Sequence, residues 1–346
     1  MLQAIITFLI MPLAPFWFYG DMAASLQNEP VSNGEVFQLD QRASAASLEE
    51  TTFDSEALAS HSIFPVDSAL AAGLVPIRKA DVADLKVWAG SSVAIDVDTG
   101  TIIHYDDGRK RTQIASLTKM MTAVLAVENI KDLNEDVVIT KEALNMVGTV
   151  VGCPTSVFCN GNRMYVGEKV RAMDLLKVML MNSANDSATA LGIHIAGTPE
   201  KFVEMMNKKA KDLGLKDTNF CTPSGLEIDG KEDQCYSSAY DIARIAAYSL
   251  KYDVIWDIMK IPEGKFYSTD GKYVHELKNT DMLLNTLPNC IGGKTGFTPL
   301  AGKSLMLGTE DPTGKHKVIA VLLNDEQRWD DMRTLVGWVF NNYKWQ

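Results

Sequence analysis

The strand-like patterns of this chain lie near the two ends of its globular part, and helical patterns fill the middle. Short apolar runs bounded by turn residues predict two early strands and three late ones: residues 92–97, 101–105, 290–297, 304–308 and 318–323. A closing helix is predicted over residues 330–343. The early and late segments must therefore meet in one sheet.

The middle of the chain is predicted to be mostly helical. Residues 119–127 are almost wholly apolar, and residues 173–181 are strongly so. Thr198 and Pro199 provide an N-cap and a first-turn proline for a further helix, and Ser238 can cap another. The section before the late strands is predicted to be rich in loops.

Residues 2–19 contain no charged side chain, and as a helix they would extend about 27 Å, close to the thickness of a bilayer core. Pro12 and Pro15 would kink such a helix, no lysine or arginine precedes it, and residues 22–24 match a cleavage site only in part. We expect residues 1–20 to be a signal peptide or an N-terminal membrane anchor. The protein would then be exported to the periplasm or cell envelope.

Residues 21–75 hold nine acidic side chains and one basic one, and no apolar period persists there for two helical turns. Such a segment cannot bury enough apolar surface to offset the entropy lost on ordering. We therefore predict a flexible acidic linker over residues 21–76 and a globular domain over residues 77–346.

Composition excludes several classes of function. A formal net charge of −11 argues against a nucleic-acid partner, because neutralising phosphates requires a basic surface. The five histidines show no metal-ligand spacing, so neither a metal site nor a cofactor is expected. Five cysteines in 346 residues are too few for a disulfide scaffold.

Three short motifs occur once each: SLTK at residues 116–119, SAN at 183–185 and KTG at 294–296. Each has a structural explanation of its own, such as a helix cap at Ser116 or Asn185, a lysine stem on an apolar surface, or a turn. An SxxK string is expected about once by chance in a protein of this size. Their order and placement, at a helix start, between two helices and on a late strand, outweigh these explanations and predict an active site.

The residue types fit nucleophilic catalysis. Ser116 at a helix N-terminus lies near free N–H groups, and Lys119 follows on the same face. Lys119 can act as the base only if its pKa is depressed, which burial and the second cation Lys294 would achieve. Ser183 can relay a proton to the leaving amine, and Asn185 can orient Lys119 and the substrate amide. The predicted catalytic residues are Ser116, Lys119, Ser183 and Asn185.

The KTG strand is predicted to bind substrate. Lys294 and Thr295 can bind a carboxylate. The N–H of Phe297 can join the N–H of Ser116 in an oxyanion hole. The predicted substrate-binding residues are Lys294, Thr295, Gly296 and Phe297.

With these motifs, the chain resembles the serine-type D-alanyl-D-alanine carboxypeptidases, the low-molecular-mass penicillin-binding proteins. The similarity runs from about residue 77 to residue 343 and includes five blocks in the family's order: IASLTKMMTAVLAVE, VGEKVRAMDLLKVMLMNSANDSATALG, DTNFCTPSGL, YSSAYDIARIA and GGKTGFT. It implies an α+β fold of the serine β-lactamase and DD-peptidase type. In that fold a five-stranded antiparallel sheet is flanked by helices and accompanied by a mostly helical subdomain.

The resemblance also implies an activity in cell-wall biogenesis and cell shape. The enzyme would remove the terminal D-alanine from peptidoglycan stem peptides through an acyl-enzyme on Ser116. β-Lactams would be covalent inhibitors, and an uncleaved N-terminal segment would attach the protein to the membrane. The sequence departs from the family at residues 297–302, where most members have a more polar stretch, so the local substrate contacts stay open.

Three alternatives stay open. A class A β-lactamase shares the motifs but needs a glutamate that activates the deacylating water; the chain has no Glu-x-x-x-Asn pattern on a suitable loop after Asn185, and Glu227 is the nearest candidate. A DD-endopeptidase would differ only in the shape of its cleft. A catalytically silent wall-binding protein is the third, because a fold does not guarantee an activity.

The cysteines allow local pairing in an exported chain. We predict disulfides between Cys153 and Cys159 and between Cys221 and Cys235, with Cys290 left as a small buried apolar residue in a strand. Five reduced cysteines and the other connectivities are the alternatives.

Overall fold

The structure of the chain is a computed structural model that describes residues 74–153, 159 and 162–346. The predicted signal peptide or anchor over residues 1–20 lies outside the described residues, as does the predicted linker apart from residues 74–76. Within the described ranges, no helix is long and apolar enough to cross a membrane. Among the described residues, the first regular element is strand β1 (Pro76–Arg78).

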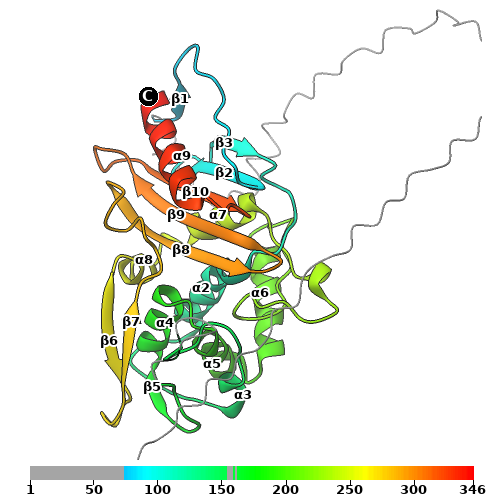
Figure 1. The fold of residues 1–346 in the computed structure, drawn as a ribbon, viewed down its shortest axis with the longest axis vertical. Coiled ribbons are helices and arrows are strands. Elements are labelled where there is room, and N and C mark those ends of the chain that lie inside the picture. Colours follow the sequence, from blue (N-terminus) through cyan, green and yellow to red (C-terminus); the bar gives the residue numbers. More distant parts are fainter. Residues whose placement is uncertain (1–73, 154–158, 160–161) are drawn as a thin grey trace, which may run out of the picture. The chain divides into compact units, whose positions relative to one another are not determined.

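Antiparallel strands form the central sheet in the spatial order β3, β2, β10, β9 and β8 (Figure 1). Two come early in the chain and three late: β2 (Ser91–Asp96), β3 (Ile102–Asp106), β8 (Cys290–Thr298), β9 (Gly302–Glu310) and β10 (Lys317–Leu323). The two groups meet where β2 pairs with β10, with Val93 opposite Val321. The prediction of one sheet assembled from both ends of the chain is confirmed.

Helices cover both faces of this sheet, because successive side chains of a strand point to opposite sides. Val321 belongs to the larger apolar core, and its neighbour Leu322 belongs to a second cluster. Helix α7 (Ala239–Ser249) contacts β2 and β10 on the side of the larger core. Helix α9 (Arg328–Asn342) covers the other face with an apolar stripe made of Met332, Leu335, Val336 and Val339.

The remaining helices lie between β3 and β8 in the sequence and include a helical subdomain beside the sheet (Figure 1). Their bounds are α2 (Lys119–Asn129), α3 (Lys141–Leu144), α4 (Ala172–Met181), α5 (Asn185–Ala196), α6 (Pro199–Asp212) and α8 (Asp253–Met259). Both predicted caps are present, since the Thr198 and Ser238 side chains accept hydrogen bonds from the third backbone N–H after them. Helices α2, α4 and α5 pack on one another. Helices α2 and α5 each begin with a residue of the site described below, and the link between α4 and α5 carries another.

The section between α7 and β8 differs from the prediction of loops. It holds α8 and a hairpin of β6 (Glu263–Tyr267) and β7 (Val274–Lys278). Phe266, His275 and Leu277 are the hairpin's buried side chains, too few to give a clear alternation in the sequence. The prediction was therefore wrong for these elements.

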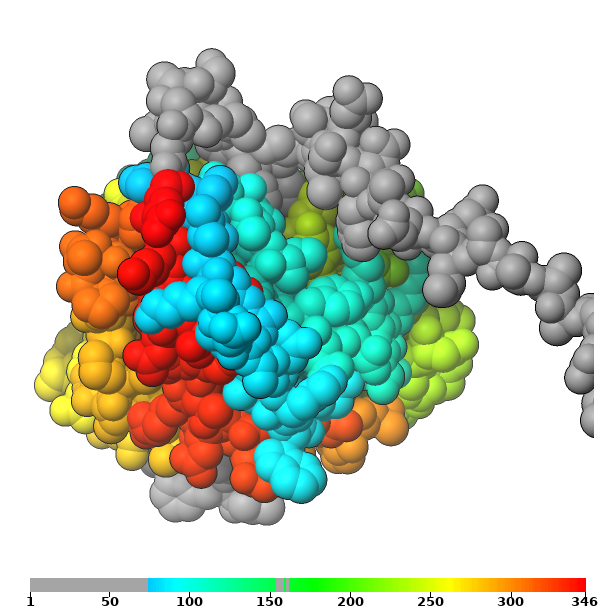
Figure 2. Space-filling model, turned by 90° about the horizontal axis from the view of Figure 1, so that it is seen from above, coloured from blue at the N-terminus to red at the C-terminus, as the bar shows by residue number. Residues whose placement is uncertain are grey.

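Two further strand pairs were not predicted, because three residues are too short to show a pattern. They are β1 with β11 (Tyr343–Trp345), and β4 (Asp136–Val138) with β5 (Lys169–Arg171). Figure 2 shows the first described residues beside the C-terminal ones, where β1 and β11 pair. The start and the end of the described chain are thus tied together.

Candidate active site

Ser116 lies in a short 3-10 turn, η1 (Ala115–Thr118), immediately before α2. The α-helix itself begins at Lys119, where the predicted apolar stretch also begins, so Ser116 lies just before the helix. Ala115 has a φ of 47°, a left-handed conformation that is strained for a residue with a Cβ. The other three residues of the turn are buried and Ser116 is half-buried, so its hydroxyl is the accessible group of this turn.

Lys119 is fully buried, and its Nζ lies 2.7 Å from Ser116 Oγ. Nζ also donates to Asn185 Oδ1 at 2.8 Å and to the backbone carbonyl oxygen of Ser224 at 2.7 Å. Burial, followed by the positive charge of Lys294, holds the pKa of Lys119 well below its usual range. A buried amine that loses its proton this readily can accept the proton of a neighbouring hydroxyl.

Lys294 provides a second fully buried amine, on the sheet side of the site. Its Nζ donates to Ser183 Oγ at 2.9 Å and to the carbonyl oxygen of Thr295 at 2.9 Å. Burial, followed by the guanidinium of Arg328, lowers the pKa of Lys294 to about 7, and Asp281 acts in the opposite direction. Ser183 lies between α4 and α5 with a φ of 65°, a second strained residue at the site.

Asn185, the first residue of α5, connects Lys119 to the rest of the subdomain. Its Oδ1 accepts from Lys119, while its Nδ2 donates to the carbonyl oxygen of Val147 at 2.7 Å. Its backbone N–H donates to the carbonyl oxygen of Thr149 at 2.8 Å. The side-chain amide of Asn185 is thereby fixed on both sides, by Lys119 at its oxygen and by Val147 at its nitrogen.

Strand β8 passes directly beside the serine turn. A Cβ added to Gly296 would lie 2.9 Å from the carbonyl oxygen of Ile114, so only glycine permits this approach. Thr295 Oγ1 is 2.8 Å from Thr280 Oγ1. Phe297 is 59% exposed. Its predicted role in the oxyanion hole involves its backbone N–H and not its side chain.

The structure therefore brings the predicted residues together in two hydrogen-bonded groups, and it places the backbone of β8 against the serine turn at Gly296. Ser116, Lys119 and Asn185 form one group, and Ser183 with Lys294 forms the other. The two groups are coupled electrostatically, because the charge of Lys294 acts on Lys119.

Sequence reasoning missed some contributors. Ser224 acts through its backbone carbonyl, for which a sequence carries no side-chain signal. Arg328 Nη1 donates to the carbonyl oxygen of Gly296 at 3.0 Å, and no motif surrounds this arginine in the sequence. Glu227 was considered only as a β-lactamase glutamate, and its Oε1 accepts from the Thr298 hydroxyl at the end of β8.

Both predicted disulfides, Cys153–Cys159 and Cys221–Cys235, are present. Cys290 is a free thiol at the start of β8, half-buried, and burial raises its pKa to about 12. Within the part of the chain that the structure describes, no group of three or more His, Cys, Asp or Glu side chains is placed to hold a metal ion.

Comparison with known proteins gives concordant results. The family model described as D-alanyl-D-alanine carboxypeptidase matches residues 78–327. A D-alanyl-D-alanine carboxypeptidase of Bacillus subtilis is 32% identical over 274 residues, which cover 76% of this chain and 64% of the relative. The chain thus spans a little under two thirds of that relative's length.

Solved structures show the same fold. The D-alanyl-D-alanine carboxypeptidase of Mycobacterium tuberculosis is 28% identical with a TM-score of 0.66, covering 76% of this chain and 95% of the other. Penicillin-binding protein D2 of Listeria monocytogenes, in its ampicillin-bound form, is 26% identical with a TM-score of 0.62, covering 75% and 100%. On the match of residues 78–327, this chain belongs to the D-alanyl-D-alanine carboxypeptidase family.

Proposed function

We propose that this protein removes the terminal D-alanine from peptidoglycan stem peptides, with Ser116 as the residue that is acylated. The observation that carries this proposal is the 2.7 Å contact between Ser116 Oγ and the Nζ of Lys119. That amine is fully buried and its pKa is far below its usual range. Family membership supports the class of reaction, and this contact supports the choice of nucleophile and base.

In the acylation step, neutral Lys119 accepts the Ser116 proton, and the Ser116 oxygen attacks the carbonyl carbon of the penultimate D-alanine. A C–O bond forms, and the C–N bond to the terminal D-alanine breaks. The leaving amine needs a proton, and the hydroxyl of Ser183, which accepts a hydrogen bond from Lys294, is placed to relay one. Asn185 keeps Lys119 in position through its Oδ1.

Substrate recognition falls to the sheet side. Lys294 and Thr295 would bind the terminal carboxylate, and an arriving anion would favour the charged form of an amine whose pKa is about 7. The backbone N–H groups of Ser116 and Phe297 would stabilise the oxyanion. The close approach of β8 to the serine turn at Gly296 supports this pairing of donors.

Release of the acyl group is by water, which returns Ser116 to its free form. A β-lactam would acylate the same serine, and the ampicillin-bound Listeria neighbour supports this class of inhibitor.

We place the domain in the cell envelope, with residues 1–20 as signal or anchor and residues 21–76 as spacer. A reporter that is active only after export should be active when fused after Val75, and activity of a cytoplasm-only reporter at this position would refute the placement.

The test of the activity is D-alanine release from an acyl-Lys-D-Ala-D-Ala peptide by the purified protein. Wild type should release D-alanine, and Ser116→Ala should release none. Rapid nitrocefin turnover without D-alanine release would show a β-lactamase. Cleavage of cross-linked dimers alone would show a DD-endopeptidase.

A further inference from the structure

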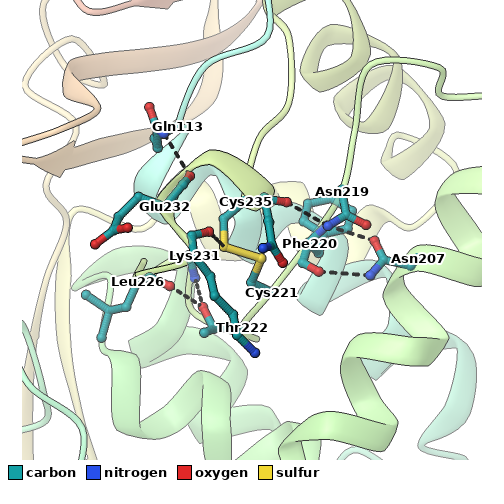
Figure 3. The surroundings of a disulfide bond; sticks show 12 residues. Gln113, Asn207, Asn219, Phe220, Cys221, Thr222, Leu226, Lys231, Glu232 and Cys235 are labelled. Carbon is teal, nitrogen blue, oxygen red and sulfur yellow. Dashed lines mark hydrogen bonds between the residues drawn. A yellow bond between two sulfur atoms is a disulfide. The ribbon is translucent and has the colours of Figure 1, made fainter. Parts of the chain in front are cut away.

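One loop reaches from a disulfide to the proposed catalytic base. The 221–235 loop starts at Cys221 and returns through the short turn η2 (Glu232–Gln234) to Cys235, which is bonded to Cys221 (Figure 3). Between the two cysteines lies Ser224, whose carbonyl oxygen accepts from Lys119 Nζ at 2.7 Å. The loop therefore supplies one of the three oxygens around that amine.

Further contacts hold the backbone of the loop against η1 and the start of α2. The carbonyl oxygen of Pro223 accepts from the Thr122 hydroxyl at 2.6 Å. Gly225 has a φ of 85°, and a Cβ added there would lie 1.9 Å from the carbonyl oxygen of Ala115. Residues 223–225 thus sit directly on the turn η1 and the first turn of α2, with no room for a side chain at Gly225.

The Cys221–Cys235 disulfide lies close to this contact. Both cysteines line a small cavity between the loop and the serine turn, together with Ala115 and Thr118. Asn207 makes two hydrogen bonds to the backbone of Phe220, but these hold the chain just before the loop begins (Figure 3). The disulfide is the covalent tie between the start of the loop, which carries the Ser224 carbonyl, and its return.

We propose that the Cys221–Cys235 disulfide is a positioning element of the active site, which holds the Ser224 carbonyl against Lys119 and makes acylation sensitive to reduction. This inference rests on the proposed function of Ser116 and Lys119. Both cysteines are only half-buried, so a small dithiol can reach the bond. In the exchange the dithiol is oxidised to a disulfide, and Cys221 and Cys235 each gain one electron and one proton as thiols.

Reduction should slow acylation because a displaced Ser224 carbonyl no longer fixes Lys119 beside Ser116. Displacements of about 1 Å at an active site cost roughly 10²-fold in rate, so a loss of about tenfold or more is expected. The loss should appear in the acylation rate constant at saturating β-lactam. The half-saturating concentration should change less, because the loop reaches β8 through Glu227 and Thr298 at the end of the strand, and not through Lys294 or Thr295. A general loosening of the site would move both quantities.

The experiment measures the acylation of the full chain by a fluorescent penicillin, with and without dithiothreitol. Reduced wild type should be slow, and reoxidation should restore its rate. Cys221→Ser/Cys235→Ser should be slow and indifferent to dithiothreitol. The matched control, Cys153→Ser/Cys159→Ser, should still be slowed by the reductant, which assigns the effect to the other bond.

If the Cys221→Ser/Cys235→Ser variant does not fold, the cycle of reduction and reoxidation of wild type, read against the control variant, decides the question alone. An acylation rate that neither reduction nor removal of Cys221 and Cys235 changes would overturn this inference while leaving the proposed function intact. A wild-type protein that takes no label on Ser116 would instead overturn the proposed function.

Discussion

The two sides of the site each contribute one fully buried lysine, and the two differ in what surrounds them. On the helical side, Lys119 contacts the nucleophile, an amide oxygen and a backbone carbonyl, all neutral oxygens. On the sheet side, Lys294 contacts the Ser183 hydroxyl and a carbonyl oxygen, and not the nucleophile. Charges of both signs act on each amine: Lys294 and Asp186 on Lys119, and Arg328 and Asp281 on Lys294. Both amines have lowered pKa values because burial penalises the ammonium form.

This difference separates two tasks. Lys119 touches Ser116, and its pKa lies well below the usual range, so the neutral form that a general base needs is readily available. Lys294 has a pKa of about 7, so an approaching carboxylate can shift it to the charged form. The same residue type therefore serves as base on one side and as carboxylate receptor on the other. Each prediction below tests either the role of Lys119 as base or the role of the sheet side in binding the carboxylate.

The largest effect is expected at Lys119. Lys119→Ala should slow acylation by at least 10²–10⁴-fold, the usual contribution of general-base assistance. Lys119→Arg should be similarly slow, because a guanidinium keeps its proton. The measurement is the rate of labelling by fluorescent penicillin, and a near-normal rate in either variant would mean that another group takes the Ser116 proton.

A smaller effect is expected at Thr295. Thr295→Val should lower kcat/KM by about 10–100-fold, the contribution of a hydrogen bond to a charged group. Amidating the terminal carboxylate of the test peptide should then cost wild type more than it costs the variant. Equal losses in the two proteins would remove Thr295 from carboxylate recognition.

The pH profile of kcat/KM separates the two lysines. Activity should rise with pH as Lys119 becomes neutral, and it should fall above about pH 7 as Lys294 loses the charge that it holds below its pKa. Lys294→Arg should keep the rising limb and move the falling limb to higher pH, since arginine stays charged. A falling limb that does not move in this variant would assign it to another group.

The smallest effect is expected from Arg328, which acts on Lys294 through its charge. Arg328→Gln should raise the pKa of Lys294 and move the falling limb up by roughly 0.5 to 1 pH unit. Arg328→Lys keeps a positive charge and is the matched control, so its falling limb should stay near that of wild type. An identical shift in both variants would point to lost hydrogen bonds instead of lost charge.

The parts of the fold that were predictable have strong local signals. Strands β2 and β10 consist almost wholly of buried side chains, and the cap of α6 is a Thr-Pro pair. The hairpin of β6 and β7 escaped prediction because most of its side chains are exposed. Its position depends on tertiary contacts, such as the buried pair of His275 with Glu168, which are 107 residues apart.

The site divides in the same way. Ser116 and Lys119 are three residues apart, so their contact follows from helical spacing alone, and both predicted causes of the lowered Lys119 pKa, burial and Lys294, act in the structure. Ser224 contributes a backbone atom, and Arg328 acts across 32 residues on Gly296. No local sequence pattern indicates either contribution, so both are found only in the folded structure.

The central claim, that Ser116 is the nucleophile activated by Lys119, is tested most directly by locating the covalent adduct. Wild type incubated with ampicillin should gain the mass of one drug molecule, and peptide mapping should place it on Ser116. Ser116→Ala should gain no ampicillin adduct, and its Tm should lie within a few degrees of that of wild type, which shows that the variant is folded. An adduct retained by Ser116→Ala, or mapped to any other residue of wild type, would contradict the account.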